Sequence, residues 1–336
     1  MNLTYQPYDL YFKYPFTISG FSRTHTRIVL TQIALEGHIG YGEATLPPYL
    51  GETAETISTL LDKAKNILKK QTYPFDIEAI MSQIDALADG NKAAKAGVDI
   101  ALHDLKAKMM HIPVWQLLGS NPKHMPLTSC TLGIDTPSVL RQKVEEAKAF
   151  KVLKVKLGSD DDKQIINTIR EVTDKPLYVD ANQGWTDRHM AVDMVLWLAD
   201  KGVQIVEQPM LKGDIEGNGF VAQQSPIPIF ADESFQRLSD MAHIKGAFHG
   251  INLKLMKCTG LNEGLKIVSA ARKSNLKILI GCMSETSCAI KAAAALAPLC
   301  DYADLDGPWL VKNNPFDPPI LRGGKIQLSH GAGLDL

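Results

Sequence analysis

Four short stretches decide the fold: VLKVKLG at 152–158, LYVDANQGW at 177–185, QIVEQP at 204–209 and IFADES at 229–234. Each contains the apolar residues of a buried strand and ends in charged or polar residues. Helix-like stretches separate them, so strands and helices alternate in the βαβα order that forms parallel sheets.

The same order fills the chain from Pro126 onward. We predict eight strands, near Leu127–Thr131, Val152–Lys156, Leu177–Asp180, Ile205–Glu207, Ile229–Asp232, Ile251–Lys254, Ile278–Ile280 and Tyr302–Leu305. Eight such units predict an α/β fold, a (β/α)8 barrel of the TIM type, whose active site lies where the carboxyl ends of the strands meet.

The chain before the barrel follows another pattern. Arg27–Leu35 partly alternates, Gly37 offers a turn and Ile39–Ala44 returns as a hairpin partner, which predicts a small antiparallel sheet. Apolar residues then recur at helical spacing over Thr53–Lys70 and Lys92–His111. We expect an α+β capping domain over 1–122, the barrel over 123–308, and a tail over 309–336 that packs back on the capping domain.

Composition excludes several classes of function. Of 336 residues, 45% are hydrophobic and 22% charged, and 36 Lys and Arg against 37 Asp and Glu give a formal net charge of −1. This balance predicts neither a nucleic-acid partner nor a membrane-surface partner. The start of the chain lacks the apolar core of a signal peptide and no later stretch is long enough for a membrane span, so we expect a cytoplasmic protein.

The cysteines fit that compartment. They are five in number, lie at Cys130, Cys258, Cys282, Cys288 and Cys300, and show no CxxC spacing. An odd number without metal-ligand spacing predicts reduced thiols.

Charged side chains end several predicted strands, about one strand-helix unit apart. Asp180, Glu207 and Asp232 end three successive strands and offer only oxygen ligands, the set that suits Mg²⁺. Any one of them alone would more often be a solvated strand end or a helix cap. Three carboxylates at the ends of three successive strands favour a metal site.

Two lysines would flank this metal site. Lys156 ends the second predicted strand and Lys254 the sixth, on opposite sides of a barrel mouth, so their amines could exchange protons with opposite faces of one substrate. Lys154 shares the face of Lys156, because alternate residues of a strand point the same way. Lys257 falls off the alternating face and is expected to be an ordinary lysine.

These motifs resemble the enolase superfamily in its muconate-lactonizing subgroup. The resemblance rests on KVKLG, VDANQGW, VEQP, ADES and NLKLMK, and residues 93–119 are similar to the family's segment that joins cap and barrel. It implies that the three carboxylates bind one Mg²⁺ per subunit, that Lys156 and Lys254 are the acid/base pair, and that Lys154 supplies further positive charge. We expect Asn182, on the face of Asp180, to support the metal site.

ADLDGP at 303–308 indicates the substrate within the superfamily. It resembles the Asp-x-Asp of dipeptide epimerases, which implies that Asp304 and Asp306 pair with a substrate ammonium group. GCMSETS at 281–287 is similar to a loop of the same enzymes, so Cys282 and Met283 are expected to contact substrate. The resemblance implies an isomerase that inverts the C-terminal residue of Ala-Xaa dipeptides by 1,1-proton transfer through an enediolate.

Two segments of the cap, Thr17–Thr26 and Leu46–Gly51, are expected to be mobile lids over the barrel mouth. Members of the family that act on Ala-Glu tend to present an arginine from the first segment. That position holds Phe21, with Arg23 displaced by two. This difference favours Ala-Ala or Ala-hydrophobic dipeptides over Ala-Glu, with Phe21 and Arg23 as candidate substrate contacts.

Alternatives remain open at this point. An o-succinylbenzoate synthase or a muconate cycloisomerase would use the same lysines and metal, but its substrate has no ammonium group for Asp304 and Asp306. Sugar-acid dehydratases are disfavoured because the seventh predicted strand lacks their histidine. A non-catalytic metal- or amino-acid-binding barrel would need neither lysine. From the family resemblance we expect a homo-oligomer.

Overall fold

The computed structural model describes residues 1–46 and 50–336, and these form two main sheets. The first is antiparallel, in the order β1 (Asn2–Ile18), β2 (Phe21–Leu35) and β3 (His38–Thr45). The second has eight parallel strands: β4 (Ser129–Leu132), β5 (Val152–Lys156), β6 (Leu177–Asp180), β7 (Val203–Glu207), β8 (Ile229–Ala231), β9 (Gly250–Lys254), β10 (Lys277–Gly281) and β11 (Tyr302–Asp304).

The eight-stranded sheet is a nearly closed barrel. Each strand pairs with the next one in sequence, and an isolated parallel bridge between Thr128 and Ala303 joins the two ends. Most of the strands are followed by a helix: α5 (Pro137–Glu146), α6 (Asp162–Arg170), α7 (Arg188–Asp200), α8 (Ile215–Gln224), α9 (Leu261–Lys273), α10 (Ser287–Leu296) and α11 (Gly307–Leu310). After β8 the described helical turn is the 3-10 turn Leu238–Met241. The predicted barrel is confirmed, with strand ends within two residues of expectation.

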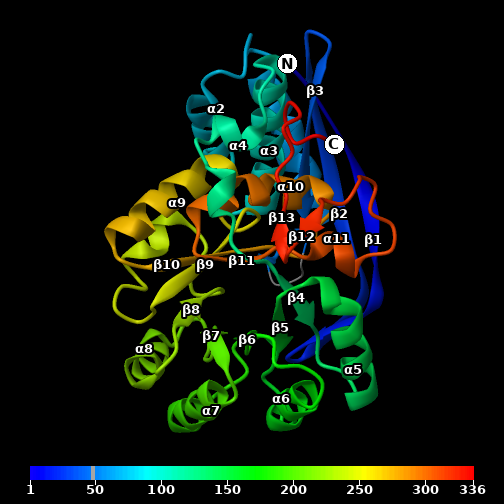
Figure 1. The fold of residues 1–336 in the computed structure, drawn as a ribbon. Helices are drawn as coiled ribbons and strands as arrows, with labels where there is room; N and C mark the ends of the chain where they lie inside the picture. The colour runs from blue at the N-terminus through cyan, green and yellow to red at the C-terminus, as the bar shows by residue number, and fades with distance from the viewer. Residues whose placement is uncertain (47–49) are drawn as a thin grey trace.

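The antiparallel sheet and its helices cover one side of the barrel (Figure 1). These helices are α1 (Ala54–Leu68), α2 (Ile77–Asp85), α3 (Lys92–Met109) and the short α4 (Val114–Leu117). Helix α3 lies unusually close to β3, because a Cβ at Gly42 would stand 2.0 Å from the Gly97 carbonyl oxygen. Thr31 Oγ1 also donates a hydrogen bond of 2.7 Å to that oxygen. The glycine therefore fixes the distance between helix and sheet.

Two elements of this part differ from expectation. Strand β1 and helix α2 were not predicted. The segment Thr17–Thr26 is the end of the β1–β2 hairpin, whose turn has Gly20 at a φ of 72°, and its role as a lid stays a prediction. At this end Thr17 pairs with Ser22 and Ile18 with Phe21 across the two strands. The second expected lid, Leu46–Gly51, falls largely on residues 47–49, outside the described residues.

The C-terminal tail returns to the cap. It contains the two-residue strands β12 (Leu321–Arg322) and β13 (Lys325–Ile326), and Figure 1 shows both termini at the same end of the molecule. The backbone amide of Leu334 donates to Asp104 Oδ1 at 2.7 Å, and that of Gly333 donates to the Ile112 carbonyl at 2.9 Å. These contacts support the division into a cap (1–122), a barrel (123–308) and a returning tail (309–336), which we keep as a proposal.

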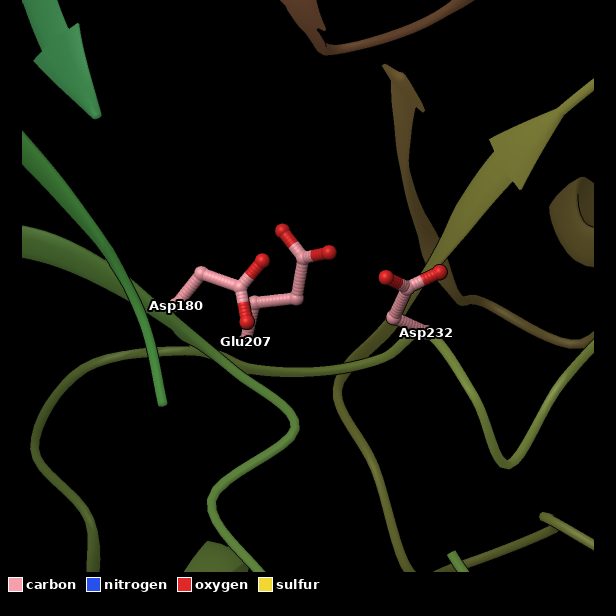
Figure 2. Close-up of side chains that lie close together, drawn as sticks. All are labelled: Asp180, Glu207 and Asp232. Carbon is pink, nitrogen blue, oxygen red and sulfur yellow. The ribbon is translucent and has the colours of Figure 1, made fainter. Parts of the chain in front are cut away.

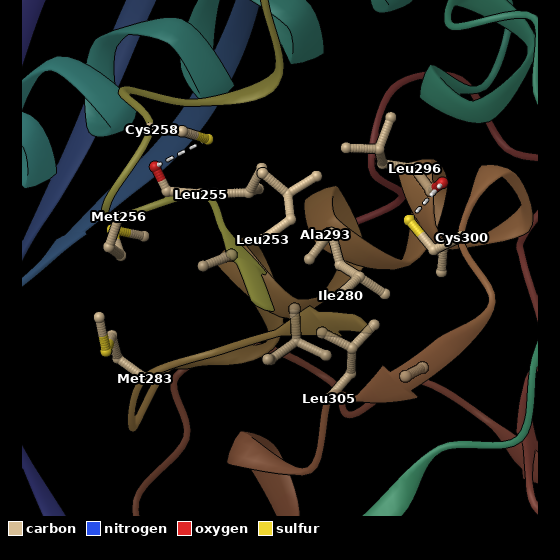
Figure 3. Close-up of a cluster of buried hydrophobic side chains, with 14 of the residues drawn as sticks. Leu253, Leu255, Met256, Cys258, Ile280, Met283, Ala293, Leu296, Cys300 and Leu305 are labelled. Atoms are coloured by element: carbon tan, nitrogen blue, oxygen red, sulfur yellow. Dashed lines mark hydrogen bonds between the residues drawn. The ribbon is translucent and has the colours of Figure 1, made fainter. Parts of the chain in front are cut away.

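Outward-facing side chains of the barrel bury an apolar layer beneath its helices. Leu253 of β9 and Ile280 of β10 pack in a cluster with Ala293 and Leu296 of α10 (Figure 3). Cys258 and Cys300 are buried in the same cluster, and all five cysteines are free, as expected from their number and spacing. Among residues 1–46 and 50–336, no helix is both long and apolar enough to cross a bilayer.

Candidate active site

The interior of the barrel is layered because alternate residues of each strand point inward. The lower layer is an apolar cluster of Val152, Tyr178, Ile205, Phe230 and Leu279. Two residues farther along the strands this layer gives way to the charged or polar side chains Lys154, Asp180, Glu207, Asp232 and Asp304. The apolar layer closes the barrel below them, so these groups face the mouth.

Three carboxylates form a candidate metal site. Asp180, Glu207 and Asp232 lie on or just beyond β6, β7 and β8, and one oxygen from each lies within 4.8 Å of the others. Figure 2 shows the three side chains directed toward a common space. All three are buried, and the backbone amide of Asn182 holds Asp180 Oδ1 at 2.9 Å. An oxygen-only set of this kind fits Mg²⁺.

Each metal-site carboxylate also contacts a buried lysine. Lys156 Nζ lies 2.6 Å from Asp180 Oδ2, and Lys254 Nζ lies 2.7 Å from Asp232 Oδ2. Lys154 Nζ is 2.8 Å from Glu207 Oε2 and 3.4 Å from Asp180 Oδ2. The three lysines come from β5 and β9, on either side of the carboxylates.

Burial and neighbouring charges move the carboxyl pKa values in different directions. Burial and the charge of Asp180 raise the pKa of Glu207 to about 8. Burial also acts to raise the pKa of Asp180 and Asp232, but the lysines beside each hold both pKa values below the ordinary range. Burial alone would lower the pKa of Lys154, yet the surrounding carboxylates raise it well above its usual value. Lys154 therefore carries a permanent positive charge in the barrel interior.

The two aspartates of ADLDGP have different surroundings. Asp304 Oδ2 lies 2.8 Å from Lys154 Nζ, and its other oxygen accepts a 2.7 Å hydrogen bond from Ser129. Asp306 accepts a hydrogen bond from the backbone amide of Thr131, and burial together with Asp304 raises its pKa to about 7. Asp304 thus has a cationic partner within the chain, whereas Asp306 has only neutral donors within hydrogen-bond distance among the described residues.

One cavity brings together the predicted site residues other than the three metal-site carboxylates. It is lined by side chains that include Lys154, Lys156, Asn182, Lys254, Asp304 and Asp306. Phe21 and Arg23 reach it from the β1–β2 hairpin, and Cys282 and Met283 from the segment after β10. The Arg23 guanidinium donates to Thr26 Oγ1 at 2.9 Å and to Ser284 Oγ at 3.1 Å. Arg23 therefore faces the cavity despite its displacement in sequence.

Three polar residues of the site were missed or misjudged. Lys257, expected to be ordinary, is buried and contacts Asp232 Oδ1 at 2.5 Å, because the chain turns after β9 and the strand alternation no longer applies. Asn252 of β9 donates a 2.6 Å hydrogen bond to Glu207 Oε1. Glu233 accepts from Asn182 Nδ2 at 3.4 Å, so Asn182 contacts it as well as Asp180. The position of Asn252 could have been predicted from the sequence. It lies two residues before Lys254 and so shares its face of the strand, just as Lys154 shares the face of Lys156.

Comparison with known proteins places this geometry in a family. Residues 5–119 match the mandelate racemase/muconate lactonizing enzyme N-terminal domain, and residues 139–335 match the enolase C-terminal domain-like family. The chain is 50% identical over 335 residues to a Bacteroides thetaiotaomicron protein named L-Ala-D/L-Glu epimerase, covering 99% of this chain and 87% of that protein. It is 35% identical over 334 residues to a hydrophobic dipeptide epimerase of a Flavobacteria bacterium, covering 96% and 94%.

A solved structure agrees over the same length. The dipeptide epimerase of Enterococcus faecalis in complex with Mg and L-Leu-L-Tyr superposes with a TM-score of 0.91 at 34% identity, covering 99% of this chain and 98% of that one. The sequence matches and the shared fold extend over cap and barrel alike. The chain therefore belongs to the mandelate racemase/muconate lactonizing enzyme family of the enolase superfamily.

Proposed function

We propose that this protein is a Mg²⁺-dependent dipeptide epimerase, an isomerase that inverts the C-terminal residue of Ala-Xaa dipeptides. The observation that carries the proposal is the position of two lysines. Lys156 of β5 and Lys254 of β9 line one cavity, and the candidate metal ligands come from the strands between them. A substrate over those carboxylates would have one amine on each face.

The two lysines would perform the proton transfer. A neutral lysine amine on one face removes the α-proton, and the protonated lysine on the other face returns a proton to the same carbon. The net change is inversion at that carbon, without oxidation or reduction. Because both lysine residues are nearly buried, at 8% and 4% exposure, bulk water would have little access to the site of proton transfer.

Charge stabilisation would come from two sources. Bound Mg²⁺ would supply positive charge where the substrate carboxylate becomes an enediolate. Asp180, Glu207 and Asp232 would hold it, and their buried carboxylate oxygens fit that ion. Lys154, fixed between Glu207 and Asp304, would add a permanent positive charge close by.

The aspartate pair would select a dipeptide. Asp306 lines the cavity with Asp304, so together they offer carboxylate oxygens to an ammonium group. The relatives described above are named for dipeptides, which carry such a group, and the Enterococcus faecalis structure contains the dipeptide L-Leu-L-Tyr. A substrate without an amine would leave Asp306 buried without a cation.

For the second residue we propose that small or apolar side chains are preferred over glutamate. The cavity wall includes Phe16, Ile18, Phe21, Met283 and Leu310. Arg23 is the cationic side chain that could recognise a glutamate, and it is already engaged by Thr26 and Ser284. The relative at 50% identity is named for Ala-Glu, so Arg23 is the residue on which this preference depends.

The test is to incubate the chain with Mg²⁺ and L-Ala-L-Xaa dipeptides and to separate the epimers by chiral chromatography. Formation of L-Ala-D-Xaa from Ala-Ala, Ala-Val or Ala-Leu supports the proposal. If no dipeptide is epimerised, the proposal is wrong, and the o-succinylbenzoate and muconate reactions become the next substrates. Assembly as a homo-oligomer and a cytoplasmic location remain predictions.

A further inference from the structure

Asn252 occupies a space that β10 leaves open. It is fully buried, and a Cβ at Gly281 would stand 2.4 Å from Asn252 Oδ1 and 2.8 Å from its Nδ2. Real Cβ atoms do not approach other atoms so closely, so the amide and a side chain at position 281 exclude each other. Gly281 has no positive φ, so its backbone conformation does not demand glycine. The absence of a side chain at Gly281 leaves space for the Asn252 amide of the neighbouring strand β9.

The amide is directed at a metal-site carboxylate. Asn252 Nδ2 donates to Glu207 Oε1 at 2.6 Å, while Lys154 Nζ lies 2.8 Å from Glu207 Oε2. Glu207 has one more rotatable bond than the aspartates beside it, so it needs more restraint to hold one position. The amide of Asn252 on β9 thus donates a hydrogen bond to one carboxylate oxygen, and the ammonium group of Lys154 on β5 forms an ion pair with the other.

The arrangement has a cost that points to a functional role. Among the described residues, Asn252 Oδ1 has no hydrogen-bond partner although it is buried. Leaving a buried acceptor unsatisfied is unfavourable, and an apolar residue of the same size would avoid it. The amide contributes one strong contact, the one to Glu207.

We propose that Asn252 is a positioning residue that orients Glu207 for the metal, and that Gly281 is glycine because it makes room for that amide. This inference rests on the proposed function, because it assumes that Glu207 binds Mg²⁺. Asn252 is not among the described residues that line the cavity, and its amide would transfer no proton. Its effect would reach catalysis through the position of one carboxylate.

A double-mutant cycle tests the proposal on the full chain. Asn252→Ala and Gly281→Ala are made singly and together, and Mg²⁺ dissociation constants are measured by calorimetry after chelation. Asn252→Leu keeps the volume, and Gly219→Ala is the matched control, since its Cβ would meet only Ala247 at 3.5 Å. Thermal unfolding shows that each variant is folded.

We expect each Asn252 variant to weaken Mg²⁺ binding about 10- to 100-fold, the usual effect of losing a ligand's hydrogen-bond partner. Gly281→Ala should weaken it too, and the double variant should match Asn252→Ala, because both changes remove the same contact. Gly219→Ala should bind Mg²⁺ like the parent.

Two results would overturn the proposal. One is that the Asn252 variants bind Mg²⁺ as tightly as the parent; the other is that the loss of Mg²⁺ affinity in the double variant equals the product of the losses in Asn252→Ala and Gly281→Ala. Either would leave the proposed function standing if the parent binds Mg²⁺ and epimerises a dipeptide. A parent that does neither would contradict the proposed function and this inference with it.

Discussion

Lys154 Nζ lies 2.8 Å from Asp304 Oδ2 and thereby links the candidate metal site to the aspartate pair. The lysine is 1% exposed and also contacts Glu207 and Asp180. One buried cation thus compensates three carboxylates that would otherwise repel one another. The charge of Lys154 therefore acts on both the candidate metal site and the aspartate pair proposed to bind the substrate ammonium group.

Replacing this lysine should destabilise the fold. Lys154→Met keeps most of the side-chain volume but leaves buried carboxylates without their cation, which costs about 3–5 kcal/mol. Urea unfolding in the absence of substrate measures the loss. Lys65→Met is the control, because the Lys65–Asp62 pair is exposed, and it should have a much smaller effect. Equal losses in the two variants would show that Lys154 has no special electrostatic role.

Metal removal should abolish turnover. Chelation should stop epimerisation and added Mg²⁺ should restore it, because the charge developing on the substrate carboxylate then lacks its main stabiliser. Mg²⁺ binding should weaken by at least about 100-fold in each of three variants, Asp180→Asn, Glu207→Gln and Asp232→Asn. This loss exceeds the usual effect of removing a residue that only hydrogen-bonds to a metal ligand. Asp193→Asn, at an exposed position of α7, is the control. Full activity after exhaustive chelation would contradict the metal assignment.

Dipeptide binding should weaken as pH falls. The pKa of Asp306 is raised to about 7 by burial and by Asp304, so the carboxylate is ionised above that pH and neutral below it. At saturating Mg²⁺, the dissociation constant of L-Ala-Gly should rise roughly fivefold to tenfold from pH 7.5 to pH 6.0 as Asp306 loses its charge. Calorimetry measures it, with N-acetyl-Ala-Gly as the control that lacks the ammonium group. The same pH dependence for both ligands would exclude Asp306 as the cause.

Substrate preference should depend on the β1–β2 hairpin. We expect kcat/KM to be higher for Ala-Leu than for Ala-Glu, and Phe21→Ala to lower the Ala-Leu value about tenfold through lost apolar contact. Arg23→Ala should leave Ala-Leu nearly unchanged. A large loss of Ala-Glu activity in Arg23→Ala, from a parent that prefers Ala-Glu, would reverse the proposed preference.

The barrel and its carboxylates could be predicted because parallel strands end at one edge. Asp180, Glu207 and Asp232 follow apolar runs at regular spacing, and that spacing alone places them together. Lys257 could not be placed in this way, since its position depends on the turn after β9. The β1–β2 hairpin could not be predicted, because the pairing of Thr17 with Ser22 depends on the tertiary structure and glycine content does not reveal it.

The central claim is that Lys156 and Lys254 act on opposite faces of one carbon, and deuterium exchange tests it most directly. L-Ala-L-Ala and L-Ala-D-Ala are incubated separately in deuterated water with Mg²⁺, and NMR follows the α-proton of the second residue. The parent and the exposed control Lys70→Ala should exchange and invert both epimers. Lys156→Ala and Lys254→Ala should lose inversion by about 100-fold or more, and each should exchange only one epimer, a different one for each variant. Inversion at the parent rate in either variant, or exchange of the same epimer by both, would contradict the two-lysine mechanism.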